Sequence, residues 1–246
     1  MGCYNDDVLF IHIPKCAGWS VKKYLQDHLP GILMPDDPAS KLPIGHVRLQ
    51  DIERFTGRKP ESFAKILAVV RDPYEQQLSQ WSFWADRYAR GQRHIHDAVA
   101  ASYATLTEWL RDPRCDFHCW YHQHVGYRRG QTPAQQEATA VTDRPATAGV
   151  NRYEDFGGIY RYWLSVDGEV PANVEVIRLE EIETALPVAV FGAVDPKQEP
   201  PVQWLNSSPH RRATREYYTP EAARLVEAKV AWAFEHYYPK WLYSDG

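Results

Sequence analysis

Three short runs of apolar, mostly β-branched residues occur along the chain, and each is followed by a more polar segment with helical spacing. The runs are VLFIHI at 8–13, FAKILAVV at 63–70 and VEVIRL at 174–179. Continuous apolar runs of this length between turn residues predict strands that are buried on both faces. Strands that alternate with helices predict an α/β fold, in which a mainly parallel sheet carries helices on both faces.

The positions of the helices follow from capping residues and prolines. The first helix is predicted to begin near Ser20 as its cap, and the second follows Pro73, which suits the first turn of a helix. The full set of predicted helices is 20–29, 49–55 closed by Gly57, 74–89, most of 94–125, 180–192 and 220–238.

Length and composition limit the kinds of protein that the chain can be. A length of 246 residues fits one domain, and the polar, proline-interrupted stretch 126–150 is predicted to be a surface loop. The chain has 28 Lys and Arg against 32 Asp and Glu, which gives a net charge of −4. A protein that binds the backbone of a nucleic acid needs many basic residues on one face, so no nucleic-acid partner is expected.

The cysteines and the N-terminal residues indicate the cellular compartment of the protein. Cys3, Cys16, Cys115 and Cys119 are too few and too unevenly spaced for a disulfide scaffold. The N-terminal residues lack the basic and then apolar pattern of a secretory signal, and no stretch approaches the roughly 20 apolar residues of a spanning helix. We therefore expect a cytoplasmic protein without a membrane partner.

The loop after the first predicted strand has the composition of an anion site. It reads HIPKCAGWS at 12–20, with Lys15, an Ala-Gly pair and a hydroxyl near the start of a helix. Backbone N–H groups at a helix start face an anion, and a lysine adds a point charge. The loop differs from a Walker loop, because its lysine precedes the glycine and no second glycine lies upstream. A lysine at a strand end beside an ordinary capped helix explains the same residues, so this loop alone leaves both interpretations open.

A second candidate anion site follows the second predicted strand. Arg71 ends that strand, and Ser79 lies about two turns into the helix that Pro73 begins. The planar guanidinium of arginine offers several N–H donors in a geometry that suits a phosphate, and the Ser79 hydroxyl could contact the same phosphate. Because parallel strands place ligands at their carboxyl ends, two such sites on one edge suit a ligand with two separated phosphate groups.

These two segments resemble the motifs of a known enzyme family. HIPKCAGWS resembles the HIPKTGGTS element, and RDPYEQQLSQW at 71–81 resembles the RDPxxRxxSxY element, of sulfotransferases that use 3′-phosphoadenosine 5′-phosphosulfate (PAPS), particularly the carbohydrate-type branch. The order of the motifs, their separation and the Gly-His pair between them also agree. The resemblance covers two motifs well and most of the chain loosely. It implies a P-loop-like sulfotransferase fold that binds PAPS and releases 3′-phosphoadenosine 5′-phosphate (PAP).

The resemblance assigns a role to individual residues. It places the 5′-phosphosulfate on Lys15, Cys16, Ala17, Gly18, Trp19 and Ser20, with Lys15 at the bridging oxygen. Arg71 and Ser79 would hold the 3′-phosphate, and His46 would be the general base. The chain departs from the family pattern at four positions. Cys16 and Trp19 replace hydroxyl residues, Ala17 replaces a glycine and Gln76 replaces an arginine. Side-chain donors are lost at some of these positions, while the backbone N–H donors remain. Cys16 could also be a reactive thiol if Lys15 and the helix start lower its pKa, but a buried, inert thiol is the interpretation that we prefer.

The implied activity is transfer of a sulfuryl group from PAPS to a hydroxyl of a small-molecule or carbohydrate acceptor. The step would be an in-line displacement in which His46 takes the proton of the acceptor. By the same resemblance Arg211 and Arg212 would fold over the nucleotide, although a solvated basic turn explains them equally well. The insert at about 94–150 would shape the acceptor site through His118, Trp120, His122 and Gln123.

Three other functions compete with this interpretation. Cys115, His118, Cys119 and His122 fall on one helix face and are a zinc-binding set, but one straight helix cannot wrap four ligands around an ion, so we expect no metal. A P-loop kinase would need a Mg²⁺-binding Ser or Thr directly after the lysine, where Cys16 stands. A non-catalytic nucleotide- or zinc-binding module remains the third alternative.

Overall fold

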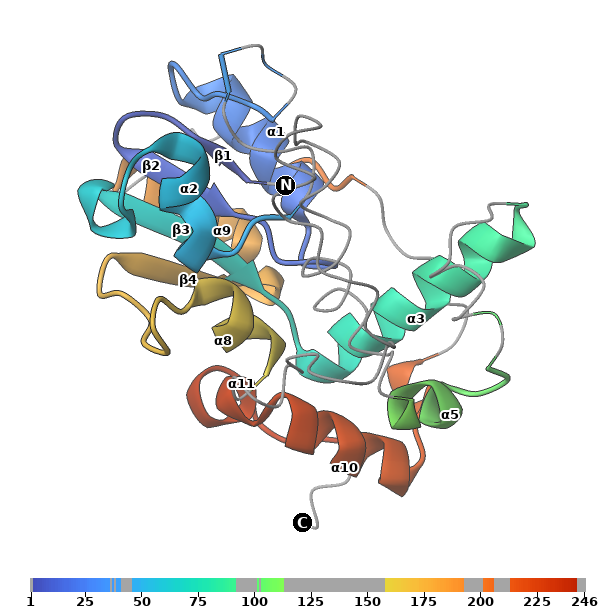
Figure 1. Cartoon of the computed structure of the whole chain (residues 1–246). Coiled ribbons are helices and arrows are strands. Elements are labelled where there is room, and N and C mark those ends of the chain that lie inside the picture. The colour runs from blue at the N-terminus through green and yellow to red at the C-terminus, as the bar shows by residue number, and fades with distance from the viewer. Residues whose placement is uncertain are drawn as a thin grey trace, which may run out of the picture.

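A four-stranded sheet with the order β1-β2-β3-β4 lies at the centre of the molecule (Figure 1). The structure is a computed structural model, and it describes residues 2–35, 37, 39–40, 46–91, 101, 103–112, 158–192, 201–205 and 213–242. Within these residues the fold is α/β, as the alternating pattern predicts.

Three of the strands are parallel and correspond to the three apolar runs of the sequence. They are β2 (Val8–Ile11), β3 (Lys65–Val70) and β4 (Val174–Arg178). Leu9 pairs with Ile66, and Ile66 pairs with Val174 on its other side. The edge strand β1 (Cys3–Tyr4) pairs antiparallel with β2, and its two residues are too short a run to be recognised in the sequence.

Helices cover both faces of the sheet, which confirms that part of the prediction. On one face, α1 (Gly18–His28) and α9 (Ile182–Phe191) lie side by side, because the Phe191 ring contacts the rings of Tyr24 and His28. On the other face lie α2 (Ile52–Thr56) and α8 (Ile159–Leu164), which stand in front of the sheet in Figure 1. Short 3-10 turns complete these connections: η1 (Leu49–Asp51), η2 (Pro60–Ser62) and η6 (Leu179–Glu181).

A second group of helices lies beyond the carboxyl ends of the strands. It consists of α3 (Pro73–Ala89), α5 (Leu106–Arg111), η7 (Thr214–Tyr217), α10 (Pro220–Lys229) and α11 (Ala231–His236). Tyr74 of α3 donates a 2.7 Å hydrogen bond to Glu227 of α10, and Arg111 of α5 forms an ion pair with Glu221. Figure 1 shows α10 and α11 crossing below α3, so the last part of the chain supports the segment that follows β3.

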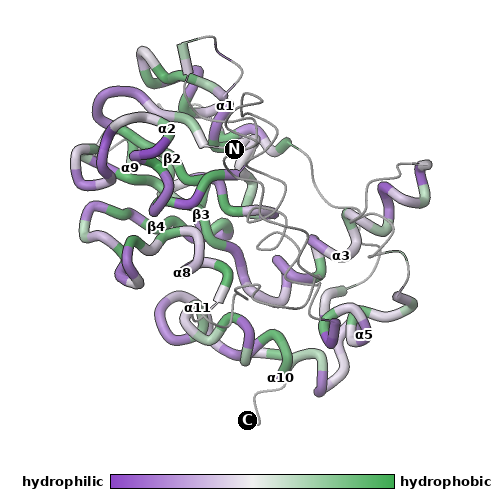
Figure 2. The backbone as a smooth tube through the Cα atoms, in the orientation of Figure 1, coloured by the Kyte–Doolittle hydropathy of each residue, from purple (hydrophilic) through white to green (hydrophobic). Residues whose placement is uncertain are grey.

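The hydrophobic core is centred on the parallel strands. All residues of β3 after Lys65 are buried, and so are Leu9, Phe10 and Ile11 of β2. Figure 2 shows this as hydrophobic stretches along β2 and β3, with hydrophilic stretches in the turns at the rim. A strand buried on both faces carries no polar alternation, which is why these runs stand out in the sequence.

Two helix predictions are wrong in detail. The first helix starts at Gly18 with Ala17 at the N-cap position, whereas Ser20 was the predicted cap and lies buried inside the helix. The predicted helix 220–238 breaks at Val230, where the backbone of Gly158 lies so close that a Cβ on Gly158 would lie 2.8 Å from the Val230 Cα. The predicted loop 126–150 and most of the predicted insert lie outside the described residues. Among the described helices, none has the length and hydrophobicity that crossing a membrane requires.

Candidate functional site

The loop between β2 and α1 has a strained backbone. Lys15 has a φ of 65° and Ala17 a φ of 50°, and within the described residues Asp167 alone joins them as a non-glycine residue with positive φ. This left-handed region costs most side chains free energy, and such residues gather at functional sites. No side chain caps the N-terminus of α1, so the first N–H groups of the helix have no side-chain acceptor.

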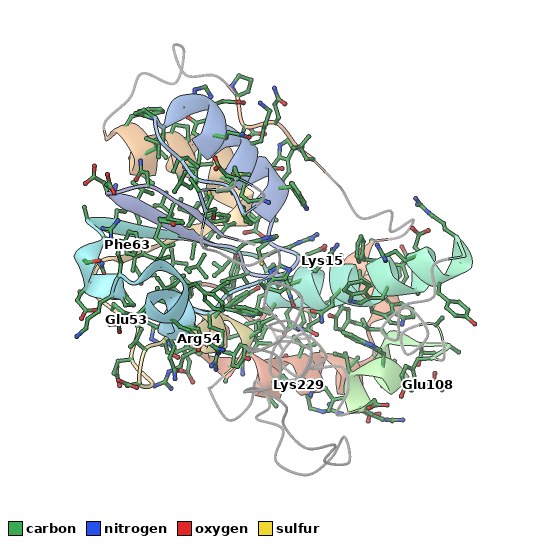
Figure 3. All side chains as sticks on the ribbon, turned by 45° about the horizontal axis from the view of Figure 1, so that its top comes forward. Lys15, Glu53, Arg54, Phe63, Glu108 and Lys229 are labelled. Atoms are coloured by element: carbon green, nitrogen blue, oxygen red, sulfur yellow. The ribbon has the colours of Figure 1, made fainter. Side chains whose placement is uncertain are left out.

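Lys15 points from this loop toward α3, as Figure 3 shows. Its Nζ lies 3.8 Å from the centre of the Phe83 ring. No carboxylate and no hydrogen-bond acceptor contacts this ammonium group among the described residues. Burial, with a smaller contribution from nearby Arg71, lowers the pKa of Lys15 from 10.5 to about 8. A largely buried cation without a counter-ion is costly, and an anionic ligand would remove that cost.

One face of α3 packs against the same loop. Gln76 Nε2 donates a 3.1 Å hydrogen bond to the Pro14 carbonyl, and Phe83 lies under the Lys15 ammonium group. Ser79 falls between Gln76 and Phe83 on the helix and is fully buried. Ser79 therefore lies on the part of α3 that packs against this loop, and its predicted role with Arg71 at a phosphate stays a prediction.

Arg71 lies at the carboxyl end of β3, and its backbone is held by Tyr160 of α8. The Arg71 N–H donates a 3.3 Å hydrogen bond to the Tyr160 hydroxyl, which itself donates to the Arg71 carbonyl. The guanidinium Nη2 bonds Glu75 at 3.1 Å, while Nε and Nη1 have no acceptor among the described residues. A hollow of about 540 Å³ opens beside Arg71 and is lined by Arg71, Glu75, Leu179, Glu180, Glu181, Ile182, Glu183, Thr184 and Trp204.

Asp72 connects this hollow to the C-terminal part of the chain. Its Oδ1 accepts hydrogen bonds from the N–H groups of Tyr74 and Glu75 at 3.0 and 3.2 Å, which caps α3. Its Oδ2 accepts a 2.7 Å bond from the Trp241 indole. Glu180, at the end of β4, accepts the Asp72 N–H at 3.1 Å. Burial raises the pKa of Asp72, and the Trp241 hydrogen bond opposes that rise.

His46 lies against the first loop in an orientation that suits a base. Its Nδ1 lies 3.0 Å from the His12 carbonyl oxygen, which can only accept, so Nδ1 carries the proton. The neutral imidazole then has its lone pair on Nε2. The His46 ring also contacts the rings of His12 and Trp163, at centroid distances of 4.6 and 5.7 Å.

The remaining residues of the first loop have different surroundings. Cys16 is buried, and burial raises the pKa of its thiol to about 12, which agrees with the inert thiol and not with the reactive one. The Ser20 hydroxyl accepts a 2.9 Å hydrogen bond from the Leu205 N–H, which ties a distant segment to α1. Trp19 is 46% exposed, and the Nζ of Lys22 lies 3.5 Å from the centre of its ring. Gly18 packs directly on the His12 ring.

Several predicted site residues cannot be placed, because they lie outside the described residues. They are Arg211 and Arg212 near the nucleotide, His118, Trp120, His122 and Gln123 for the acceptor, and the metal-binding candidates Cys115 and Cys119. Within the described ranges, no group of three or more His, Cys, Asp or Glu side chains could hold a metal ion.

Sequence reasoning missed three residues that build the site. Glu180 directly follows the third strand, so the rule that ligands bind at the carboxyl ends of parallel strands could have found it. Tyr160 belongs to a helix that the sequence analysis did not identify. Gln76 was noted only as a departure from a family motif, although its side chain holds the first loop to α3.

Comparison of the chain with protein-family models, with curated proteins and with solved structures finds no match. The residues of the site and their geometry are therefore what bears on the function of the protein.

Proposed function

We propose that the protein is a PAPS-dependent sulfotransferase that transfers a sulfuryl group to a hydroxyl of a small-molecule or carbohydrate acceptor. The observation that carries the proposal is the Lys15 ammonium group, which is largely buried at the end of β2 and has no anionic partner among the described residues. Such a group fits a bound oxyanion. The family resemblance of both loop motifs agrees with this choice of ligand.

The nucleotide would lie along the edge where β2 and β3 end. Its 5′-phosphosulfate would contact Lys15 and the uncapped N-terminus of α1. Its 3′-phosphate would take the Nε and Nη1 donors of Arg71, since Nη2 bonds Glu75. The hollow beside Arg71, with Trp204 on its wall, has room for the adenosine part.

The proposed reaction is a single in-line displacement. The acceptor hydroxyl oxygen forms a bond to sulfur while the bond from sulfur to the bridging oxygen breaks, and PAP leaves with that electron pair. Lys15 stabilises the negative charge that grows on the bridging oxygen. The acceptor proton passes to Nε2 of His46, whose Nδ1–H stays on the His12 carbonyl.

The first test measures which ligand stabilises the fold. A ligand at 100 times its Kd should stabilise the folded state by about 2.7 kcal/mol, so PAP, ATP and zinc are added separately in thermal unfolding. We expect a shift with PAP. A shift with ATP alone would indicate a kinase-like phosphotransferase, and a shift with zinc alone would indicate a metal-binding module; either result would refute the proposal.

The second test measures transfer of labelled sulfate from PAPS across a panel of small-molecule and glycan acceptors. His46→Ala should abolish turnover and leave PAP binding nearly unchanged. His236→Ala is the matched control, because His236 also bonds a backbone carbonyl through Nδ1 but is exposed on α11. Unchanged turnover in His46→Ala would contradict the assignment of His46 as the general base.

A further inference from the structure

A row of glutamines on α3 ends in a buried donor without an acceptor. Gln76, Gln77 and Gln80 are all buried, with exposed fractions of 0%, 3% and 0%. Gln77 Nε2 donates to Gln76 Oε1 at 2.7 Å, and Gln76 Nε2 donates both to Gln80 Oε1 at 3.2 Å and to the Pro14 carbonyl at 3.1 Å. Gln80 Nε2 ends this chain and has no hydrogen-bond partner among the described residues.

The orientation of the Gln80 amide follows from the network. Both hydrogens of Gln76 Nε2 are directed at acceptors, one of which is Gln80 Oε1. Reversing the Gln80 amide would place two NH₂ groups face to face and would break that bond. The donor of Gln80 is therefore the atom left without an acceptor. A buried donor in this state costs about 1–3 kcal/mol, which a native protein rarely retains without a reason.

This donor lies on the face of α3 that contacts the loop of Lys15. Positions 76, 80 and 83 share one face of α3, through spacings of four and three residues. Gln76 bonds the Pro14 carbonyl, and the centre of the Phe83 ring lies 3.8 Å from Lys15 Nζ. Gln80 thus stands between the two points at which α3 contacts the loop.

We infer that Gln80 Nε2 and Lys15 Nζ together bind one oxyanion, and that Gln80 is a ligand-binding residue. This inference rests on the proposed function, in which the oxyanion is the phosphosulfate end of PAPS. A neutral amide donor and an ammonium group offer an oxygen-rich anion both a directed hydrogen bond and a charge. The Gln76 side chain sets the position of both groups, because it bonds the Gln80 amide and the carbonyl of the residue before Lys15.

The test compares the affinities of PAPS and PAP for three variants by calorimetry. Gln80→Leu keeps the size of the side chain and removes the donor, so affinity should fall about 10- to 100-fold, as for other hydrogen bonds to charged groups. Gln80→Glu should weaken binding further, since a carboxylate repels the oxyanion. Gln50→Leu is the control, because Gln50 is an exposed glutamine in η1 outside this network, and it should bind as the wild type does.

The pattern of losses identifies the oxygen that Gln80 contacts. If Gln80→Leu has a lower affinity for PAPS but an unchanged affinity for PAP, the inference is supported and Gln80 contacts a sulfuryl oxygen. If the affinity for PAP falls equally, the inference is supported and Gln80 contacts a 5′-phosphate oxygen. Wild-type affinity in a folded Gln80→Leu protein would overturn this inference alone. If the wild-type protein binds neither nucleotide, the proposed function itself fails. The thermal midpoint without ligand verifies folding. Gln80→Leu removes the unsatisfied donor of Gln80 but also the acceptor of one Gln76 hydrogen, so the midpoint should change little.

Discussion

Replacement of Lys15 by methionine should stabilise the ligand-free protein at neutral pH. Burial lowers the pKa of Lys15 from 10.5 to about 8, so the folded state holds the proton less tightly than the unfolded state. At about 1.4 kcal/mol per pH unit, this difference destabilises the folded protein by about 3 kcal/mol at pH 7. The cost is fully present below pH 8 and is relieved as the pH rises from 8 to 10.5. Methionine has a similar length and no charge, so Lys15→Met avoids the cost.

Urea unfolding followed by tryptophan fluorescence measures this effect. The free energy of unfolding of Lys15→Met should exceed that of the wild type by about 3 kcal/mol at pH 7 and by only about 1 kcal/mol at pH 10. Lys59→Met is the control, because Lys59 is exposed in the turn before β3. A difference between the wild type and Lys15→Met that stays constant from pH 7 to pH 10 would refute the reasoning. In the same pH range PAP affinity of the wild type should decrease, by up to about tenfold per pH unit above 8, as free Lys15 loses its proton.

Three further predictions concern the residues that follow Lys15. Ala17→Gly should stabilise the protein by about 1 kcal/mol in denaturant unfolding, because glycine adopts the observed φ of 50° without strain; a loss of stability would contradict this. Gly18→Ala should destabilise it by about 1–3 kcal/mol or more, since the new Cβ would lie 1.8 Å from the His12 ring, and unchanged stability would show that the ring moves freely. Cys16 should resist iodoacetamide at pH 8 in the native protein and react after unfolding, as peptide mass spectrometry can measure; rapid native labelling would show that the thiol is accessible.

The parts of the fold that sequence predicts well are those with a local cause. The three parallel strands are continuous apolar runs, and α3 begins at a proline directly after a capping aspartate. Helix α8 was missed for an equally physical reason. Five of its six residues are buried, and only Arg161 is partly exposed, so it has no polar face and no amphipathic period.

The site is less predictable, because its chemistry depends on contacts between distant segments. The motifs identify Lys15, Arg71 and His46 as candidates, but they do not predict how each is paired. The proton on Nδ1 of His46 depends on a carbonyl 34 residues away, and the backbone of Arg71 is held by the Tyr160 hydroxyl, 89 residues away. The unsatisfied donor of Gln80 is set by two neighbouring amides and by the Pro14 carbonyl.

The bond between Asp72 and Trp241 has a consequence for how the protein is made. The two residues are 169 positions apart, and ribosomes add about 5–20 residues per second, so Asp72 leaves the ribosome roughly 10–30 s before its indole partner exists. During the first part of that interval the nascent chain also lacks β4, and throughout it lacks the indole that bonds Asp72 at the start of α3. A chain whose synthesis stops before residue 238 also lacks Tyr238, which donates a hydrogen bond to Glu180. A product arrested after β4 would therefore have all four strands of the sheet but lack the C-terminal contacts of Asp72 and Glu180.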